Sequence, residues 1–319
     1  MKSIKQGVAL AMMLSATMIS SAHALTVYTA GPGSLAKSLA SGYEKKTGVK
    51  VNIFQATTGK VMARLEAEQD NPQADVLISA SWDTAEDLHH RGWLLPYQSG
   101  NADKVPAALK TADYVAQGIS ALGIVWNSKS GTPEPKEWRD LTEAAFKDKV
   151  TTPDPALSGA SLDLLIGLQN GLGDKAWTLF EALKKNGMVV SGPNAQAVTP
   201  VMQGAKAAVF GAVDYVSYGN IAQGESLKVI FPASGTVIAP RPMMILKTTQ
   251  HADDAKAFVD YVLSPEGQAM VADAWLMPAR SDVPAKRPLL GELKILPTTS
   301  DGSSERSAVL SRFNALFGQ

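Results

Sequence analysis

The feature that most constrains the fold is a unit of strand, polar loop and helix that occurs three times in succession near the N-terminus. The strand-like runs rich in β-branched residues are 25–30, 49–56 and 74–80, and the amphipathic stretches that follow them are 35–48, 60–69 and 84–92. Such alternation is typical of a parallel sheet that helices cover on both faces. We therefore expect a doubly wound α/β fold.

A second α/β region of the same kind begins near Val150. Between the two regions, we expect a longer strand at 118–128 and a helix at 136–145. The run 227–247 has the pattern of two strands, of which the second carries the chain back. Helices at 253–263 and 265–274 follow, and a tail that is rich in Lys and Pro after Pro284 ends in a helical pattern at 306–317. A length of 319 residues favours two domains.

The N-terminus has the pattern of a secretory signal. Lys2 and Lys5 precede a soft apolar run at 7–20, and Ala22-His23-Ala24 places small residues at a cleavage site. We expect residues 1–24 to be removed before Leu25. An uncleaved anchor is the alternative, but the run is shorter than the roughly 20 residues that span a bilayer. The chain is then exported, and periplasmic in a Gram-negative host.

Charge and composition exclude several classes of function. Lys and Arg together number 30, as do Asp and Glu, so the formal net charge is zero. A neutral chain gives no electrostatic reason to expect a nucleic acid or an anionic membrane as partner. Cysteine is absent, which excludes disulfides, thiolate nucleophiles and Cys-ligated zinc. His89 and His90 are adjacent on a predicted helix, where their side chains diverge by about 100°. We expect no metal site and no cofactor.

Polar loops recur where the predicted strands meet the predicted helices. Ligands of open α/β sheets bind beyond the carboxyl ends of the strands, and helix N-termini favour anions. The hydroxyls, amides and glycines at these junctions therefore indicate an oxyanion site. Each loop taken alone is also explained by helix capping. The candidates in these loops are Ser34, Thr57, Thr58, Gly59, Ser81, Ser158, Ser161, Asn194, Asp214 and Tyr215.

Catalytic motifs are absent from the sequence. The run TTGKV at 57–61 lacks the upstream glycine of a P-loop and has Val61 in place of its Ser or Thr. No G-x-S-x-G elbow occurs. A periplasmic hydrolase remains the alternative of another class, with Asp214 as its single candidate base. Trp82 follows a polar loop and is either a lid over the cleft or part of the core.

Five segments in this order carry a family resemblance: LTVYTA, ARLEAEQDNPQADVLISA, LGIVWNSK, TTPDPALSGAS and YVLSPEGQAMVADAWLMPARSDV. NPQADVL and WLMPARSDV are the most specific parts. The mature chain resembles the periplasmic solute-binding proteins of ABC importers, in the branch of ferric-ion, sugar-phosphate and 2-aminoethylphosphonate binders. The resemblance implies a type II fold of two lobes, each a mainly parallel sheet flanked by helices. Strands at 118–128 and 236–247 would cross between the lobes, and hinge closure would trap the solute.

The resemblance also implies boundaries and partners. Residues 25–122 would form the first part of lobe 1 and 123–238 would form lobe 2. Residues 239–319 would supply the return crossing, the rest of lobe 1 and the C-terminal helices. A small anionic solute would pass to an inner-membrane permease with a cytoplasmic ATPase, and the protein would be a monomer. A receptor-coupled sensor is a further alternative.

The positions that bind iron in the ferric branch carry different residues in this chain. Ferric members use a His and a Glu of the first lobe and two adjacent tyrosines of the second. Here Gly31-Pro32-Gly33 contains no His, Ser79-Ala80-Ser81 contains no Glu, and the tyrosines are Tyr215 and Tyr218. Since Fe(III) needs hard anionic oxygens, these positions suit an organophosphonate or organophosphate better, with ferric ion as the alternative.

Two further residues receive roles by the same resemblance. Asp214 would pair with a ligand ammonium group or cap the following helix. Arg241 would add a positive charge at the site or brace the hinge.

Overall fold

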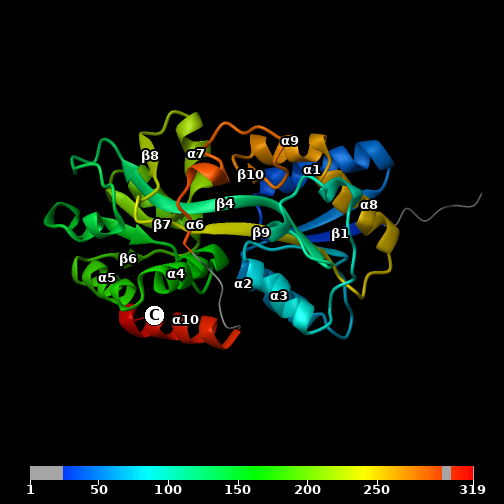
Figure 1. Cartoon of the computed structure of the whole chain (residues 1–319), viewed down its shortest axis with the longest axis horizontal. Helices are drawn as coiled ribbons and strands as arrows, with labels where there is room; N and C mark the ends of the chain where they lie inside the picture. The colour runs from blue at the N-terminus through cyan, green and yellow to red at the C-terminus, as the bar shows by residue number, and fades with distance from the viewer. Residues whose placement is uncertain (1–23, 297–302, 319) are drawn as a thin grey trace, which may run out of the picture.

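Two lobes lie side by side and are joined by long strands (Figure 1). The computed structural model describes residues 24–296 and 303–318, so the predicted signal at 1–24 lies almost wholly outside them. All strands belong to one continuous sheet with the order β2-β1-β3-β9-β4-β7-β5-β6, while β8 and β10 pair with β4. Within the described residues, no helix combines the length and the apolarity that a membrane crossing requires.

Lobe 1 contains the three predicted repeats. Its strands are β1 (Ala24–Thr29), β2 (Lys50–Gln55) and β3 (Val76–Ile78). They run parallel, and Val27 of the central β1 lies opposite both Ile53 and Val76. The helices are α1 (Gly33–Thr47), α2 (Thr58–Ala67), α3 (Trp82–His90), α8 (Ala252–Val262) and α9 (Pro265–Asp273). Gly48 ends α1 with a left-handed φ of 79°, which confirms the predicted stop.

Lobe 2 repeats this plan. Its strands are β5 (Val150–Thr152), β6 (Val189–Val190), β7 (Ala208–Val213) and β8 (Leu227–Ile230). The first three are parallel neighbours. The helices are α4 (Gly159–Leu172), α5 (Asp174–Lys185), α6 (Asn194–Met202), α7 (Asp214–Ala222) and α10 (Ser303–Phe317). Helix α10 packs on α4 and α5. The α/β fold of two lobes with mainly parallel sheets is confirmed.

Two antiparallel strands connect the lobes, β4 (Tyr114–Asn127) and β9 (Ile238–Ile245). Every residue of β4 is buried, as expected of a strand that passes through both cores. The chain crosses a third time after β10 (Met277–Pro278), because Ile295 forms a bridge with Thr236 and Leu296 lies in the lobe 2 core. The hinge therefore consists of three segments.

One predicted helix is wrong. Residues 136–145 form two short 3-10 segments, Trp138–Thr142 and Ala144–Phe146, in place of an α-helix. Glu143 between them is extended, with φ −73° and ψ 155°. The Trp138 indole donates to the carbonyl of Gly235 at 2.9 Å, and the ring is buried in the lobe 2 core. Tertiary anchoring of this ring overrides the helical propensity of the segment.

Candidate functional site

A cavity of about 730 Å³ lies between the lobes, where the N-termini of α2, α3 and α4 meet. Thr58 and Gly59 of α2 and Ser81 before α3 line it from lobe 1, and Gly159 of α4 lines it from lobe 2. The lobes touch here, since a Cβ atom on Gly159 would lie 2.7 Å from Ser81 Cβ. Three of the predicted site residues are thus brought together at the junction of the lobes.

The serines before and within α4 are used by the fold. Ser158 Oγ accepts the Ser161 amide at 3.1 Å and the Asn194 side-chain amide at 2.7 Å. Ser161 Oγ donates to the carbonyl of Pro153 at 3.1 Å. Ser158 therefore caps α4, and Ser161 holds the preceding loop. Both of their backbone N–H groups also have partners, since the Ser158 N–H donates to the Asp154 carbonyl at 3.0 Å.

Two predicted residues present buried atoms without a partner among the described residues. These atoms are Thr57 Oγ1, at the start of α2, and Asn194 Oδ1, at the start of α6. Buried polar atoms are almost always hydrogen-bonded, and each unpaired one costs about 1–3 kcal/mol. A solute with polar groups would supply the missing partners.

Asp214 is engaged by residues of the fold itself. Its side chain is fully buried and forms an ion pair with Arg287, which is also fully buried. One carboxylate oxygen also accepts the Ala121 amide at 3.0 Å, and the other accepts the Tyr215 amide at 2.7 Å. Burial raises the pKa of Asp214, and Arg287 opposes that rise. The carboxylate therefore holds α7 to the third crossing segment and is not available to a ligand ammonium group in this conformation.

Arg241 differs from Asp214 in that its buried charge has no ion-pair partner among the described residues. Only 2% of its surface is exposed, and no described carboxylate forms an ion pair with it. One nitrogen, Nη1, donates to the Ala30 carbonyl at 3.2 Å, while Nε has no hydrogen-bond partner in the part of the chain that the structure describes. The guanidinium lies 5.0 Å from the centre of the Tyr215 ring. A buried cation without an anion is costly, so this residue indicates the place of an anionic group.

Tyr215 and Tyr218 lie in different environments. Tyr215 lies beside Arg241, whereas the Tyr218 ring stacks on Trp275 at 6.1 Å and lies 5.2 Å from the Arg287 guanidinium. Burial raises the pKa of Tyr218 to about 12, which disfavours the phenolate that iron would need. Trp275 adopts a left-handed φ of 63°, so this contact holds a strained residue in place.

Nine of the twelve predicted residues, Thr57, Asn194 and Arg241 among them, are not lining residues of the cavity, and Ser34 and Trp82 are two of these nine. Ser34 is exposed in the first turn of α1. The Trp82 ring packs edge-on against Tyr114 at 5.0 Å and is not among the lining residues, as expected of a core side chain.

Arg306 of α10 reaches across the cleft. It forms ion pairs with Asp83 of lobe 1 and, at 2.9 Å, with Asp163 of lobe 2, and it donates to Ser81 Oγ at 3.2 Å. Arg306, Arg287 and Gln117 were not among the residues predicted for the site, and the buried Gln117 Oε1 has no partner among the described residues. The local sequence around an arginine in the tail does not indicate which carboxylate it pairs with. For Gln117 a signal did exist, because the Pro-Arg-Pro run at 240–242 inside a predicted strand indicates irregular strand pairing.

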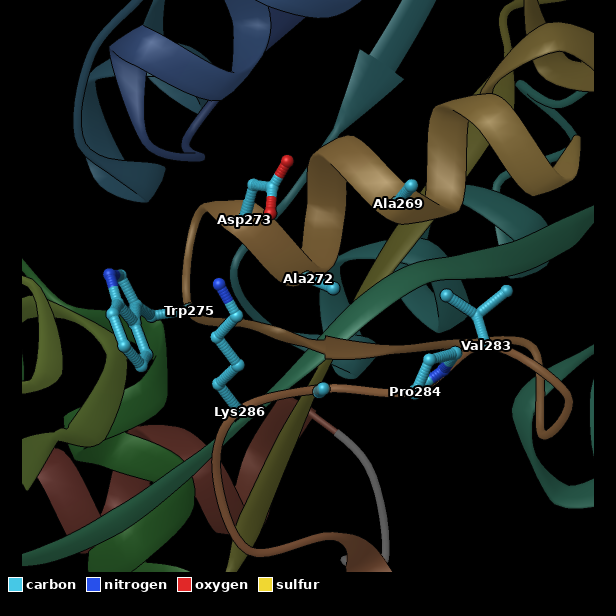
Figure 2. A pocket seen from close by; sticks show the side chains of 8 residues that line it. Ala269, Ala272, Asp273, Trp275, Val283, Pro284 and Lys286 are labelled. Carbon is cyan, nitrogen blue, oxygen red and sulfur yellow. The ribbon is translucent and has the colours of Figure 1, made fainter.

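A second cavity of about 390 Å³ lies along α9 (Figure 2). Trp275, Lys286 and Asp273 surround one end, and Val283 and Pro284 lie at the other. Its walls are α9 and the segments after it, without a contribution from the predicted site residues. The cavity in the cleft differs from it in having walls from both lobes.

The comparisons with known proteins agree with this architecture. Residues 71–301 match the family described as bacterial extracellular solute-binding protein, and the chain belongs to that family. It is therefore a solute-binding component of an ABC importer, which implies a solute and a permease as partners, and it is not an enzyme.

Two relatives span most of the chain. A protein of Haemophilus influenzae is 30% identical over 265 residues, which are 79% of this chain and 75% of the relative. A protein of Salmonella typhimurium, described as a putative 2-aminoethylphosphonate-binding periplasmic protein, is 27% identical over 76% of this chain and 73% of its own.

Two solved structures share the fold. The periplasmic binding protein AfuA of Actinobacillus pleuropneumoniae, with fructose-6-phosphate bound, has a TM-score of 0.84 at 24% identity, over 92% of this chain and 98% of its own. Iron-bound HitA of Pseudomonas aeruginosa has a TM-score of 0.80 at 21% identity, over 91% and 99%. At such identities, these structures show the fold alone.

Proposed function

We propose that the solute is a small organic anion, and that an organophosphonate or organophosphate fits the site best. The observation that carries this proposal is Arg241, a buried guanidinium without a carboxylate partner among the described residues. The polar helix N-termini in the cleft support it, since their N–H groups favour oxyanions. The relatives described as 2-aminoethylphosphonate-binding agree with this choice.

In this proposal, the residues have distinct parts. Arg241 neutralises the anion, and Thr57 and Asn194 complete their hydrogen bonds with it or with the rest of the solute. Thr58, Gly59 and Ser81 form the wall that closes on lobe 2. The protein would act in the periplasm after loss of residues 1–24, and the closed form would engage the permease.

Ferric ion is the less favourable cargo. A cation would meet the Arg241 guanidinium beside Tyr215, and Tyr218 is buried with a pKa raised to about 12. Among the described residues, no group of three or more His, Asp or Glu side chains is arranged to hold a metal. Iron would therefore need two phenolates in an environment that opposes their ionisation.

The first experiment is a thermal-shift screen of mature protein refolded from denaturant to remove bound solute. The panel contains phosphate, 2-aminoethylphosphonate, hexose phosphates, sulfate, citrate and Fe(III). A ligand at ~100 times its Kd adds about 2.7 kcal/mol, enough for a shift of several degrees. A shift with iron and none with any phosphorus compound would overturn the proposal.

Arg241→Gln provides the decisive variant. We expect the Kd for the anion to rise at least about 30-fold, or about 2 kcal/mol, because a charge-assisted hydrogen bond is lost. The stability of the unliganded variant should stay equal or rise, since an unpaired buried charge is removed. Arg139→Gln, at an exposed position, is the control. A hinge brace would give the opposite pattern, with lower stability and unchanged affinity.

A further inference from the structure

The pairing of the crossing strands β4 and β9 is interrupted by a shift of register. Ala116 of β4 lies opposite Pro242 of β9, and Ile119 lies opposite Pro240. Two residues of β4, Gln117 and Gly118, therefore face the single residue Arg241. This is a β-bulge, a device that re-aims side chains and is frequent beside functional sites. It also explains how β9 tolerates two prolines, because bulges are among the few places where a sheet accepts them.

Neighbouring elements hold the bulge in place. The carbonyl of Gln117 accepts the Gln268 side-chain amide of α9 at 2.8 Å. Gly118 pairs with Pro278 of β10, and a Cβ atom at Gly118 would lie 2.7 Å from Val271 and 3.1 Å from the carbonyl of Met277. Only glycine permits this close approach, so the position of Gln117 is fixed by its surroundings.

The Gln117 side chain has no partner for its oxygen. The residue is 2% exposed, and no described residue donates to Oε1. A Cβ atom on Gly31, which follows β1, would lie 4.0 Å from this oxygen. Arg241 donates to the carbonyl of Ala30, the residue before Gly31. Gln117 and Arg241 thus converge on the same turn from adjacent strands.

The two side chains are chemically complementary, yet no hydrogen bond joins them. Arg241 Nε is a donor without an acceptor, and Gln117 Oε1 is an acceptor without a donor. Burying both atoms without partners destabilises the fold unless another molecule satisfies them. A bound molecule that carries an anionic oxygen and a nearby N–H or O–H group would satisfy both.

We propose that Gln117 is a specificity-determining residue that accepts a hydrogen bond from an ammonium or hydroxyl group of the solute, next to the anion held by Arg241. This inference rests on the proposed function and narrows it. The preferred solute is bifunctional, with a donor group close to its phosphonate or phosphate. A bare anion of the same size would leave Gln117 Oε1 buried and unpaired.

The test uses a pair of compounds that differ by one donor, 2-aminoethylphosphonate and ethylphosphonate. Glycerol 3-phosphate and propyl phosphate form a second pair for a hydroxyl donor. Affinities are measured by calorimetry for the wild type, Gln117→Leu and Gln117→Met, with Gln203→Leu at an exposed position as the control. Two variants are used so that a folding defect in one does not decide the outcome, and the melting temperature without ligand reports on folding.

We expect the wild type to prefer the donor-bearing member of one pair by roughly tenfold or more, because a site built to hydrogen-bond a group rejects the analogue that lacks it. Both Gln117 variants should bring this ratio close to one and leave the affinity for the donor-free member within about threefold. Arg241→Gln should weaken both members together.

The results that would contradict the role of Gln117 can be told apart from the result that would contradict the proposed function. A preference that persists in folded Gln117 variants would overturn the role of Gln117 while the anionic solute stands. Equal affinity of the wild type for both members of each pair would do the same. If the wild type binds no member of either pair and binds iron, the proposed function fails, and this inference fails with it.

Discussion

The buried carboxylate of Asp163, where the two lobes touch, makes the stability of the protein depend on pH. It lies on α4, accepts the Ser81 hydroxyl at 3.1 Å and pairs with Arg306 at 2.9 Å. Burial raises its pKa from 3.8 to about 6, against the opposing effect of Arg306. The folded protein therefore binds a proton at Asp163 more tightly than the unfolded chain does.

Asp163→Asn tests this linkage. The contribution of Asp163 to stability is fully present below pH 3.8 and is lost as the pH rises through about 6. We expect the unfolding free energy of the wild type, relative to the variant, to fall by about 1–3 kcal/mol between pH 4 and pH 7. Urea unfolding at four pH values measures it, with Asp174→Asn at an exposed position as the control. Parallel pH profiles for the wild type and Asp163→Asn would contradict it.

Sequence reasoning at this scale finds polar residues but not their partners. The position after a strand identified Thr57, Asn194 and Asp214 alike, because local pattern is the same for all three. What separates them is Arg287, which lies 73 residues after Asp214 and occupies its carboxylate. No local periodicity encodes such a pairing, so the distinction between an internal and a ligand-facing polar group requires the fold.

At the scale of elements, helix α10 joins parts of the molecule that are distant in sequence. It packs on α4 and α5 of lobe 2, yet Arg306 near its start reaches Asp83 at the start of α3 in lobe 1. The charge lies between one carboxylate from each lobe. The helix therefore favours the conformation in which the lobes touch, whether or not a solute is bound.

Arg306→Gln should shift the unliganded protein toward an open form. Loss of the bridge leaves two carboxylates facing each other, and we expect the closed form to lose about 1–3 kcal/mol. Small-angle scattering should then show a larger radius of gyration, and solute should dissociate faster. Arg312→Gln is the matched control on the same helix, since Arg312 stacks on Trp177 within lobe 2. Equal radii for the two variants would exclude a role of Arg306 in closure.

The elements themselves could largely be predicted. Alternating strands and amphipathic helices gave the repeats of both lobes, because a period of two or 3.6 residues is visible in the chain. The helix predicted at 136–145 is wrong because the Trp138 indole donates a hydrogen bond to the carbonyl of Gly235, nearly a hundred residues later. The bulge at Gln117 was also missed, although the two prolines beside Arg241 marked it.

For the whole molecule, closure depends on how near the lobes can come. The close approach of Gly159 to Ser81 leaves no room for a side chain at that point, since a Cβ atom would lie 2.7 Å away. The β4 and β9 crossings and the third segment give the lobes a common hinge. Under the proposed hinge closure, the lobes would meet at a contact that requires glycine.

Gly159→Val should hold the lobes apart. We expect at least about a tenfold loss of affinity for the solute, because the added side chain sterically opposes the contact of the lobes. The slope of unfolding with denaturant and the helical circular dichroism should match those of the wild type. Gly100→Ala, in open space, is the control. Unchanged affinity would show that the solute is held without this contact.

The described chain begins with β1 in one lobe and ends with α10 on the other (Figure 1). Each end thus moves with a different lobe when the hinge bends. A donor and an acceptor fluorophore fused to the two ends of the mature protein would change their energy transfer as a solute is captured. The labelled protein would then report the concentration of its own solute without an added reagent.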